Sequence, residues 1–271
     1  MSRRRRLDAE LVRRDLAPSR TIAQALIATG RITVGGAPAA KASRLVDPGD
    51  AIEVVGDGPR FVSRGGEKLD AALEHFTVDV TGLRVVDAGS STGGFTDCVL
   101  QRGAAAVVAI DVGRNQLHER LRADPRVAVH EQTNIRHVDP ADLGGPGELV
   151  VADLSFISIR TVADQLAALS APDGDLVVLV KPQFEAGKAE ADKGRGVIRD
   201  PEVWRRTLDE AASALSAAGP AIMGVMVSPI TGGDGNVEFL AHFRHRAAGL
   251  AAADWTTARD AAVTEASEWS S

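Results

Sequence analysis

The spacing of hydrophobic residues predicts a small folded module in the first part of the chain. Between residues 7 and 55, apolar positions recur at helical spacing in two short segments and then form two strand-like runs, RITVGG and AIEVV. Ser19 can cap the second helix, Gly30 can end it, and Gly35-Gly36 can turn the chain after the first strand. We therefore expect a compact unit of two helices and a few strands.

Beyond residue 83 the pattern changes to apolar runs that alternate with helical segments. The seven strand-like runs are LRVVDAG, AVVAIDVG, VAVHEQ, ELVVADLSF, DLVVLVKPQF, AIMGVMVSP and VEFLAHF. This alternation predicts an α/β domain with a seven-stranded, mostly parallel sheet covered by helices on both faces. Ligands bind at the C-terminal ends of the strands in such sheets, so the residues after each run are the candidates for function.

The two patterns set the expected domain limits. We assign residues 1–58 to the small α+β module, 59–64 to a linker, 65–248 to the α/β domain and 249–271 to an Ala-rich tail without an assigned function. A chain of 271 residues, 44% of them hydrophobic, is long enough to form both cores.

Composition narrows the class of protein further. No run approaches 18 apolar residues, so we expect no membrane-spanning helix, and MSRRRR is not followed by the apolar stretch of a secretory signal. The single cysteine, Cys98, fits a reducing compartment. We expect a cytoplasmic protein with no metal site and no stable protein partner.

The net charge of −6 is divided unevenly along the chain. Residues 1–45 contain ten Arg and Lys but only three acids, so this stretch carries +7 and the rest of the chain −13. Such asymmetry is typical of a basic module joined to an enzyme domain. A solvated basic helix face with an Arg-rich tail would give the same composition.

The segments RLDAELV, SRTIAQALIATGRITVGG and VDPGDAIEVV resemble an S4 RNA-binding domain over nearly its whole length. The resemblance implies that the module contacts structured RNA, with Arg13, Arg14, Arg20 and Arg31 as candidate phosphate contacts. No aromatic residue precedes Phe61, so the module should read RNA shape and backbone instead of stacking bases. A protein-interaction role is the alternative.

A glycine-rich turn, VVDAGSSTGGFTD at residues 85–97, follows the first strand of the α/β domain. From Gly89 its spacing is G-x-x-x-G-G, which differs from the G-x-G-x-x-G of dinucleotide-binding folds. Asp87, which precedes the first glycine of this turn, would disfavour a pyrophosphate ligand. S-adenosylmethionine carries an ammonium and a sulfonium group instead of phosphate, so a carboxylate at this position suits it.

Two more residues follow the next two strands. Asp111 can accept hydrogen bonds from two ribose hydroxyls, although NAD enzymes place an acid similarly, and Asn134 can meet the adenine edge unless it only forms a turn. Together these features resemble the class I (Rossmann-like) methyltransferases, which implies S-adenosyl-L-methionine as the cofactor. The expected cofactor residues are Asp87, Gly89, Ser90, Thr92, Gly93, Gly94, Asp111, Asn134 and Asp153.

Four charged residues indicate the atom that is methylated. Lys68, Asp153, Lys181 and Glu238 occur in an order that resembles the tetrad of ribose 2′-O-methyltransferases. A ribose hydroxyl is a weak acid, so its methylation needs a base, and burial or a second ammonium group allows a lysine to act as one. The fourth run ends in DLSF and lacks the two prolines of enzymes that methylate base nitrogens. Base methylation is the alternative reaction, and a surface position is the alternative for Lys181.

The S4-like module followed by VSRGGEKL, DAGSSTGGFTD, VVADLSFIS, VKPQFE and GNVEF resembles the TlyA family over about residues 6–245. This resemblance implies an rRNA cytidine 2′-O-methyltransferase whose partners are ribosomal RNA and ribosomal subunits. The family's targets lie in small-subunit and, in some members, large-subunit rRNA. The resemblance also implies that Lys181 is the general base, that Lys68 and Asp153 orient it and the ribose, and that Glu238 completes the pairing. Related tetrads divide the roles of the two lysines differently.

Three expectations lie outside this enzymatic hypothesis. An RNA chaperone would use only the S4-like module. A membrane-lysing protein, as the family's second label of hemolysin implies, lacks both an apolar span and a strongly amphipathic basic helix here. The segment 185–201 is rich in Gly, Lys and Arg and is expected to form a loop, which either meets RNA beside the site or is a tolerated surface loop.

Overall fold

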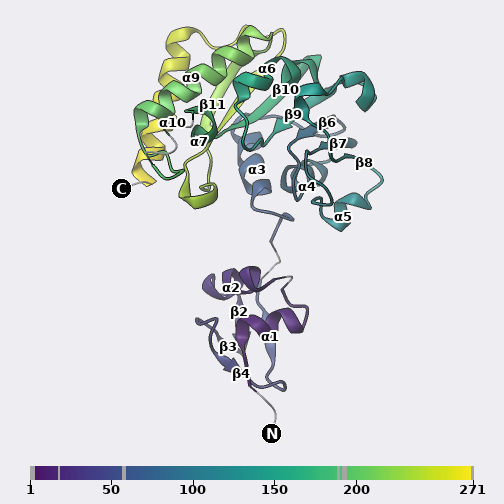
Figure 1. Cartoon of the computed structure of the whole chain (residues 1–271), viewed down its shortest axis with the longest axis vertical. Coiled ribbons are helices and arrows are strands. Elements are labelled where there is room, and N and C mark those ends of the chain that lie inside the picture. Colours follow the sequence, from purple (N-terminus) through teal and green to yellow (C-terminus); the bar gives the residue numbers. More distant parts are fainter. Residues whose placement is uncertain (1–3, 18, 57–58, 188–189, 191–193, 270–271) are drawn as a thin grey trace. The chain divides into compact units, whose positions relative to one another are not determined.

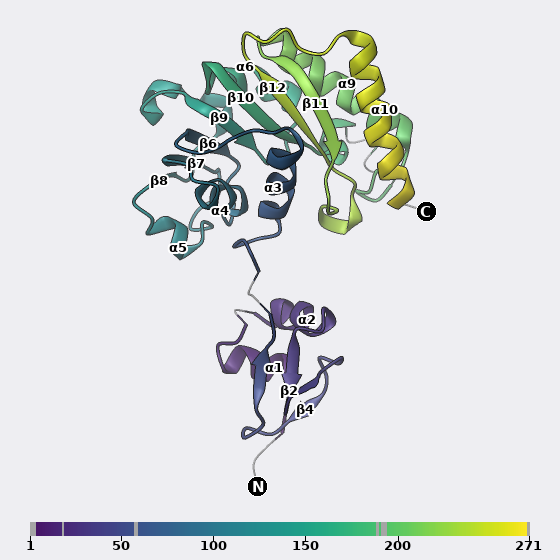
Figure 2. The same ribbon diagram turned by 180° about the vertical axis from the view of Figure 1, so that it is seen from behind.

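The chain forms two compact units, Met1–Arg60 and Phe61–Ser271, drawn from opposite sides in Figures 1 and 2. This computed structural model describes residues 4–17, 19–56, 59–187, 190 and 194–269. Parts of the predicted segment 185–201, residues 57 and 58 at the first domain limit and the last two residues of the predicted tail therefore lie outside the described residues.

The first unit packs two short helices against small antiparallel sheets. Strand β2 lies between β3 and β5, and β1 pairs with β4. Its elements are β1 (Arg5–Arg6), α1 (Leu7–Arg13), α2 (Arg20–Ala28), β2 (Ile32–Val34), β3 (Ala37–Pro38), β4 (Leu45–Val46) and β5 (Ile52–Val54). The two predicted runs are thus found as β2 and β5.

The predicted ends of helix α2 are confirmed. Ser19 Oγ accepts a hydrogen bond from Ile22 N at 3.3 Å, which satisfies one of the free N–H groups at the helix start. Gly30, with φ at 70°, follows the helix in the left-handed conformation that glycine adopts without strain. The core of the unit contains the buried residues Leu7, Leu11, Ala23, Ile27, Ile32 and Val46.

The second unit is built on a seven-stranded sheet with the order β11-β12-β10-β9-β6-β7-β8. Strand β12 is antiparallel to both of its neighbours, and the pairs from β10 to β8 are parallel. The strands are β6 (Arg84–Ala88), β7 (Ala106–Ile110), β8 (Val127–His130), β9 (Gly147–Ala152), β10 (Ser170–Val180), β11 (Ala221–Val227) and β12 (Phe239–Arg244). The predicted α/β class with a mostly parallel sheet and a small N-terminal unit is confirmed.

Helices cover both faces of this sheet (Figure 1). Alternate residues of a strand point to opposite faces, and accordingly Val85 joins the core under α3 and α4, whereas the adjacent Val86 joins the core under α6 and α9. The helices are α3 (Gly65–His75), α4 (Gly94–Gln101), α5 (Glu119–Arg122), α6 (Ile159–Ala168), α7 (Pro182–Glu185), α9 (Pro201–Ala217) and α10 (Ala252–Trp269). Short 3-10 turns are η1 (Ile135–His137), η2 (Pro140–Leu143) and η3 (Gly233–Gly235).

The strand order reverses between β6 and β9, which are neighbours although β7 and β8 intervene in the sequence. From β6 the chain continues to β7 on one side of the β6–β9 pair, and from β9 it continues to β10 on the other side. A crevice therefore opens at the C-terminal ends of these two strands, where open α/β sheets bind ligands.

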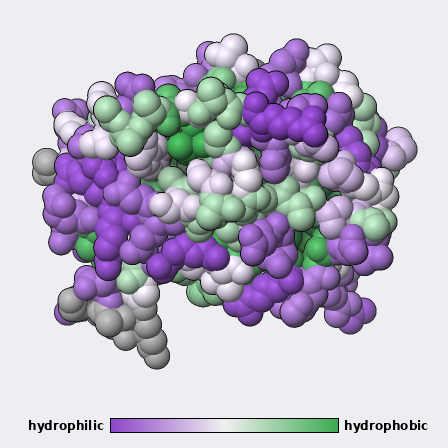
Figure 3. Space-filling model, turned by 90° about the horizontal axis from the view of Figure 1, so that it is seen from above, coloured by the Kyte–Doolittle hydropathy of each residue, from purple (hydrophilic) through white to green (hydrophobic). Residues whose placement is uncertain are grey.

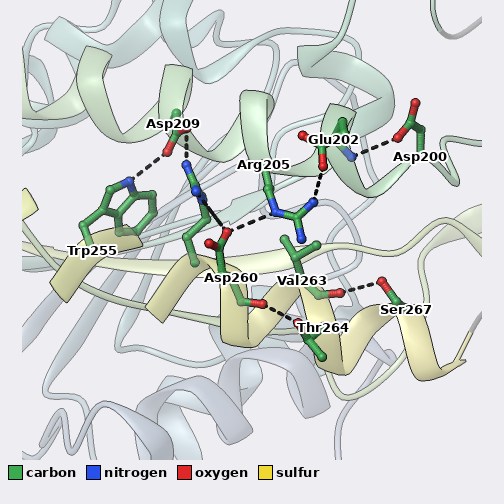
Figure 4. Close-up of polar contacts among 10 residues, drawn as sticks. Asp200, Glu202, Arg205, Asp209, Trp255, Asp260, Val263, Thr264 and Ser267 are labelled. Atoms are coloured by element: carbon green, nitrogen blue, oxygen red, sulfur yellow. Dashed lines mark hydrogen bonds and ion pairs between the residues drawn. The ribbon is translucent and has the colours of Figure 1, made fainter. Parts of the chain in front are cut away.

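The predicted tail forms helix α10, which packs along α9 and β11. Ala262, Val263 and Ala266 bury its inner side. Figure 4 shows the polar contacts with α9, where Arg205 Nε lies 3.0 Å from Asp260 Oδ1. Small alanine side chains allow the close approach, so this segment belongs structurally to the second unit.

Trp255 and Arg259 join the same contact at one carboxylate of α9. Trp255 Nε1 donates to Asp209 Oδ1 at 2.8 Å, and Arg259 Nη1 lies 2.5 Å from Asp209 Oδ2.

On the face of the molecule shown in Figure 3, apolar side chains form patches between hydrophilic ones. In the part of the chain that the structure describes, no helix has the length and apolar character needed to cross a membrane.

Candidate active site

The glycine turn connects β6 to α4 at the crevice. Gly89 has φ at 88°, and a Cβ atom added there would lie 2.5 Å from the main-chain oxygen of Asp153. Gly93 has φ at 98°, and its Cβ would meet Leu121 Cδ1. A side chain at either position would be both strained and crowded. Gly89 therefore allows the ends of β6 and β9 to lie close together, and Gly93 allows the turn to pack against Leu121 of α5.

One cavity, of about 380 Å³, lies on the β7 side of the turn. This volume is within the range of small-molecule sites. Ile110, Val112, Ile135 and Leu154 provide apolar surface, which suits a flat aromatic ring. The polar residues of its wall include Asp111, Gln116, Thr133 and Asn134.

Asp111 is held in place by the backbone of the two loops beside it. Its Oδ2 accepts a hydrogen bond from Ser91 N at 2.7 Å, and its Oδ1 accepts one from Gly113 N at 2.6 Å. Each carboxylate oxygen can accept a second bond. The fixed carboxylate can therefore still bind a pair of hydroxyls in the cavity.

Asn134 caps a short 3-10 turn and also lines the larger cavity. Its Oδ1 accepts a hydrogen bond from Arg136 N at 3.1 Å and so caps η1. The residue also lines the larger cavity. Forming the turn thus does not remove Asn134 from the wall of the cavity.

A second cavity, of about 220 Å³, adjoins the first on the other side of the turn. Gly89, Ser91 and Asp153 line both cavities. The remaining residues of its wall are Ser63, Arg64, Gly65, Lys68, Ser90, Thr92, Gly94, Phe95, Gly232 and Gly233. Most of the predicted cofactor residues therefore face one continuous crevice.

The four predicted catalytic residues form two ion pairs. Lys68 Nζ lies 2.5 Å from Glu238 Oε2, and Lys181 Nζ lies 2.5 Å from Asp153 Oδ1. Both lysine side chains are only 10% exposed, so neither is a surface lysine. Burying an ammonium group is costly without a partner, and here each has a carboxylate.

Lys181 has a second partner that sequence reasoning missed. Its Nζ donates to Ser155 Oγ at 3.0 Å. Ser155 stands in the DLSF segment two residues after Asp153, so that both follow β9 into the crevice. The position of this serine after a strand end was a usable signal, because hydroxyl groups there can contact a ligand or a catalytic side chain.

Gly232 is another residue that the sequence analysis did not single out. A Cβ atom there would lie 2.0 Å from Glu238 Oε1, so only glycine leaves room for this carboxylate. The run TGGDGN before Glu238 was the available signal, since glycines often mark places where other groups approach the backbone.

Phe156 lies at the rim of the larger cavity with 90% of its surface exposed. It adopts a left-handed backbone conformation, with φ at 62°, which is uncommon for a bulky residue. Its ring centroid is 5.1 Å from that of Phe184, which lies beside the Lys181 ammonium group. An aromatic pair thus borders the Lys181–Asp153 ion pair.

Two predicted cofactor residues, Gly93 and Asp87, are not among the residues that line the two cavities, and Asp87 lies inside the protein. Its side chain is fully buried and lines neither cavity. Oδ2 accepts a hydrogen bond from Thr96 Oγ1 at 2.6 Å, and Oδ1 has no hydrogen-bond partner among the described residues. Burial, with a smaller contribution from the nearby Asp153 charge, raises the pKa of Asp87 to about 7.

The crevice fits an adenosine compound that carries an amino-acid chain. The apolar wall and Asn134 suit an adenine ring, Asp111 suits ribose hydroxyls, and the smaller cavity with the turn residues Ser90 to Thr92 suits a short polar chain. The residues present therefore match the chemistry of S-adenosylmethionine.

The predicted RNA-contacting arginines of the first unit differ in their availability. Arg14 donates to Glu10 and to the main-chain oxygens of residues 47, 48 and 50, so its guanidinium group joins α1 to a loop. Arg31 donates to two main-chain oxygens at the end of β5. Arg13 and Arg20 each contact a buried acid but keep about half of their side-chain surface exposed, at 46% and 58%.

Comparisons with known proteins match both units. The chain matches the FtsJ-like methyltransferase family over residues 61–245 and the S4 domain family over residues 5–52. It is 49% identical to the 16S/23S rRNA (cytidine-2′-O)-methyltransferase TlyA of Mycobacterium tuberculosis, over 90% of this chain and 91% of that protein. It is also 38% identical to Hemolysin A of Brachyspira hyodysenteriae, over 88% of this chain and 99% of that protein.

Solved structures give a similar result. A hemolysin-type protein from Streptococcus thermophilus is 35% identical and superposes with a TM-score of 0.76, over 99% of this chain and 97% of that one. An S-adenosylmethionine-dependent methyltransferase from Listeria monocytogenes, at 16% identity and a TM-score of 0.50, shares the fold over 68% of this chain and 99% of its own.

Proposed function

Because the chain belongs to the TlyA family of FtsJ-like methyltransferases, we propose that it methylates the ribose 2′-hydroxyl of a cytidine in ribosomal RNA. The methyl donor is S-adenosylmethionine, the base is a lysine, and the reaction takes place in the cytoplasm. The relative from Mycobacterium tuberculosis is named for cytidine 2′-O-methylation of 16S and 23S rRNA, which supports the same substrate class here.

The observation that carries this proposal is the pair of buried lysine–carboxylate contacts in one crevice. Lys68 and Asp153 both line the smaller cavity, and each is paired with the remaining member of the predicted tetrad. A hydroxyl acceptor requires a group that removes its proton as the methyl group arrives. Methylation of a base nitrogen does not require two fixed lysines.

The cofactor would be held by the turn and by the residues of the larger cavity. Asp111 would accept hydrogen bonds from its ribose, Asn134 would face its adenine, and Ser90, Thr92 and Gly94 would line the space for its methionine part. When bound, S-adenosylmethionine supplies an electrophilic methyl group and a sulfur leaving group.

Lys181 acts on the proton of the acceptor hydroxyl. The Lys181 ammonium group, which is paired with Asp153, must first release one proton to solvent. Its Nζ could then accept the proton of the 2′-hydroxyl as the oxygen is methylated, and S-adenosylmethionine would supply the methyl group and a sulfur leaving group that takes up the bonding electron pair. Asp153 and Ser155 fix the direction of Nζ. Lys68, held by Glu238, provides positive charge beside the oxygen as its proton leaves.

The first unit supplies RNA affinity. Its match to the S4 domain family and its excess of arginine support binding to the phosphate backbone. Of the predicted contacts, Arg13 and Arg20 have the more exposed guanidinium groups, whereas Arg14 is mainly engaged within the unit. We propose that the unit binds ribosomal RNA or a ribosomal subunit and so brings the target nucleotide to the catalytic unit.

Two substitutions of Lys181 test the proposed base. Lys181→Ala removes the amine, and Lys181→Arg keeps the positive charge beside Asp153 but introduces a guanidinium group that stays protonated. We expect both variants to lose methyl transfer by at least about 100-fold, measured with radiolabelled S-adenosylmethionine and ribosomal subunits. Cofactor affinity, measured by isothermal titration calorimetry, should change little.

The position of the label distinguishes the reactions. Nuclease digestion of the product should release the label on ribose 2′-oxygen, and label on a base would overturn the 2′-O assignment. Full activity of Lys181→Arg would remove Lys181 from its role as the base. If the wild-type chain bound no S-adenosylmethionine, only an RNA-binding function would be left.

A further inference from the structure

Two buried acids lie beneath the basic residues of the first unit. The side chains of Asp8 and Glu10, both on α1, are 0% and 1% exposed. Carboxylates are almost never fully buried unless they are paired. Each of these two is bound by arginines whose side chains extend to the surface.

Asp8 is the more highly coordinated of the two. Its carboxylate accepts hydrogen bonds from Arg6 Nε at 3.1 Å and Arg6 Nη2 at 2.9 Å, a two-point contact. Arg20 Nη2, from α2, reaches the same Oδ2 atom at 3.0 Å, and Gln24 Nε2 reaches it at 2.9 Å. Because Arg6 and Arg20 share one oxygen atom, their guanidinium groups lie beside each other.

Both arginine side chains are partly exposed, and each guanidinium group has N–H donors that Asp8 does not use. Arg6 and Arg20 are 47% and 58% exposed, in contrast to the fully buried carboxylate between them. A guanidinium group carries five N–H donors, and the contacts with Asp8 use two on Arg6 and one on Arg20. The cluster of two cations and one anion keeps a net positive charge.

We infer that Asp8 positions Arg6 and Arg20 as a binding pair for one RNA phosphate group, an inference that rests on the proposed RNA-binding function of this unit. A free arginine loses side-chain entropy when a ligand immobilises it. Asp8 immobilises both side chains in the free protein, so less entropy is lost when the phosphate binds. The acid thereby strengthens binding of an anion, although its own charge repels that anion.

The positioning role requires that the Asp8 carboxylate is negatively charged. The Arg6 guanidinium group holds the pKa of Asp8 well below its usual range, so the carboxylate is charged at neutral pH. Glu10 has the same arrangement with Arg13, whose Nε and Nη2 donate to it at 2.8 and 2.6 Å. The repeated use of a buried acid under an exposed arginine supports a common positioning role.

A charge-matched pair of variants tests this inference. Asp8→Asn and Asp15→Asn both remove one negative charge from the first unit. Asp15 is exposed, forms no ion pair with an arginine among the residues that the structure describes, and has φ at 56°, a conformation that asparagine tolerates. Affinity of the full-length protein for transcripts of 16S and 23S rRNA should be measured by fluorescence titration at several salt concentrations.

We expect Asp8→Asn to weaken RNA binding by about tenfold and Asp15→Asn to leave it unchanged or slightly stronger. Simple electrostatics predicts the same small gain for both variants. An affinity of Asp8→Asn equal to that of Asp15→Asn would therefore overturn the positioning role. Thermal unfolding of each variant shows whether the first unit is still folded.

Two arginine variants separate this inference from the proposed function. The double variant Arg6→Ala and Arg20→Ala should lose RNA affinity by at least about tenfold, and unchanged affinity would mean that this surface does not bind RNA. If Asp8→Asn fails to fold, the double variant Arg6→Lys and Arg20→Lys is used, because it keeps both charges but removes the two-point contact with Asp8. It should bind about fivefold more weakly, and wild-type affinity would overturn the inference.

Discussion

Lys68 near the start of α3 and Glu238 just before β12 form an ion pair with an Nζ–Oε2 distance of 2.5 Å, although 170 positions separate them in the sequence. The contact links α3, the first helix of the catalytic unit, to the start of β12, the last strand of its sheet in the sequence. It also brings together residues from both ends of that unit beside the smaller cavity. Folding of the whole unit is therefore needed to assemble the proposed tetrad.

Removing one partner of this pair should destabilise the protein. Glu238→Gln leaves the Lys68 ammonium group buried without a counter-charge, and we expect a loss of about 3 kcal/mol in the free energy of unfolding. The double variant Lys68→Met and Glu238→Leu removes both charges and should lose less than the two single variants together. Urea unfolding of the wild type, the single variants Lys68→Met and Glu238→Leu, and the double variant measures this coupling, and Glu238→Gln is measured in the same way. Additive losses would show that the two charges are not coupled.

Gly89→Ala should impair both stability and cofactor binding. Its Cβ would lie 2.5 Å from the main-chain oxygen of Asp153, so the ends of β6 and β9 must move apart. Gly82→Ala is the matched control, because φ there is also positive, at 75°, but no atom lies within 4 Å of the added Cβ. We expect a cost of about 1–2 kcal/mol for Gly82→Ala from strain alone.

For Gly89→Ala the expected cost is larger, and affinity for S-adenosylmethionine should fall as well. Thermal unfolding and isothermal titration calorimetry measure the two effects. Cofactor affinity that is equal in both alanine variants would contradict the importance of this close approach.

Glu131 should control cofactor affinity although it lines neither cavity. Its carboxylate accepts hydrogen bonds from the main-chain N atoms of Asn115, Gln116 and Leu117, at 2.7, 3.0 and 3.4 Å, and Gln116 lines the larger cavity. The hydrogen bond from Asn115 N is the main cause that lowers the pKa of Glu131. Glu131→Gln replaces one accepting oxygen with a donor, so the loop should lose part of this support.

We expect about a tenfold rise in the dissociation constant of S-adenosylmethionine for Glu131→Gln, with a much smaller change in kcat. Arg122→Gln is the control, because it removes only the ion pair that Arg122 forms with Glu131 at 2.5 Å. Ion pairs of this partly exposed kind contribute little, so its affinity should change less than about threefold. Equal effects of the two variants would assign the stabilisation to the ion pair.

Much of the candidate site follows from the sequence because strand order and strand ends are encoded locally. Apolar runs predict the strands, and parallel strands place their C-terminal ends at one edge of the sheet. Asp111, Asp153 and Lys181 each follow such a run, and the structure brings all three to the crevice. The pairing of Lys68 with Glu238 depends on tertiary packing. The sequence pattern therefore predicts that both residues belong to the site, but it does not predict the ion pair between them.

Other positions depend on side-chain direction, which simple patterns miss. Asp87 was expected to face the cofactor because it ends a strand, yet it shares a sheet face with Val85, two residues earlier, and so points under α4 toward Thr96. The resemblance to the S4 domain implies that Arg14 contacts phosphate, but the main-chain carbonyl groups of residues 47, 48 and 50 engage its guanidinium group. Charge and spacing do not reveal such internal partners.

The buried Asp87 gives the protein a pH-dependent stability. Burial raises its pKa from 3.8 to about 7, so between about pH 4 and pH 7 the folded protein retains a proton that the unfolded chain releases. The contribution of this group to stability is therefore fully present below pH 4 and is lost as the pH rises through 7. Each unit of pKa difference corresponds to about 1.4 kcal/mol.

Asp87→Asn removes this titration while keeping an oxygen that can accept the hydrogen bond from Thr96 Oγ1. The stability of the variant relative to the wild type should thus increase from pH 4 to pH 7 and then level off. Asp164→Asn, on the exposed side of α6, is the control and should show no such trend. Urea unfolding at pH 5, 6, 7 and 8 measures the difference, and a constant difference over this range would mean that Asp87 is ionised in the folded protein throughout.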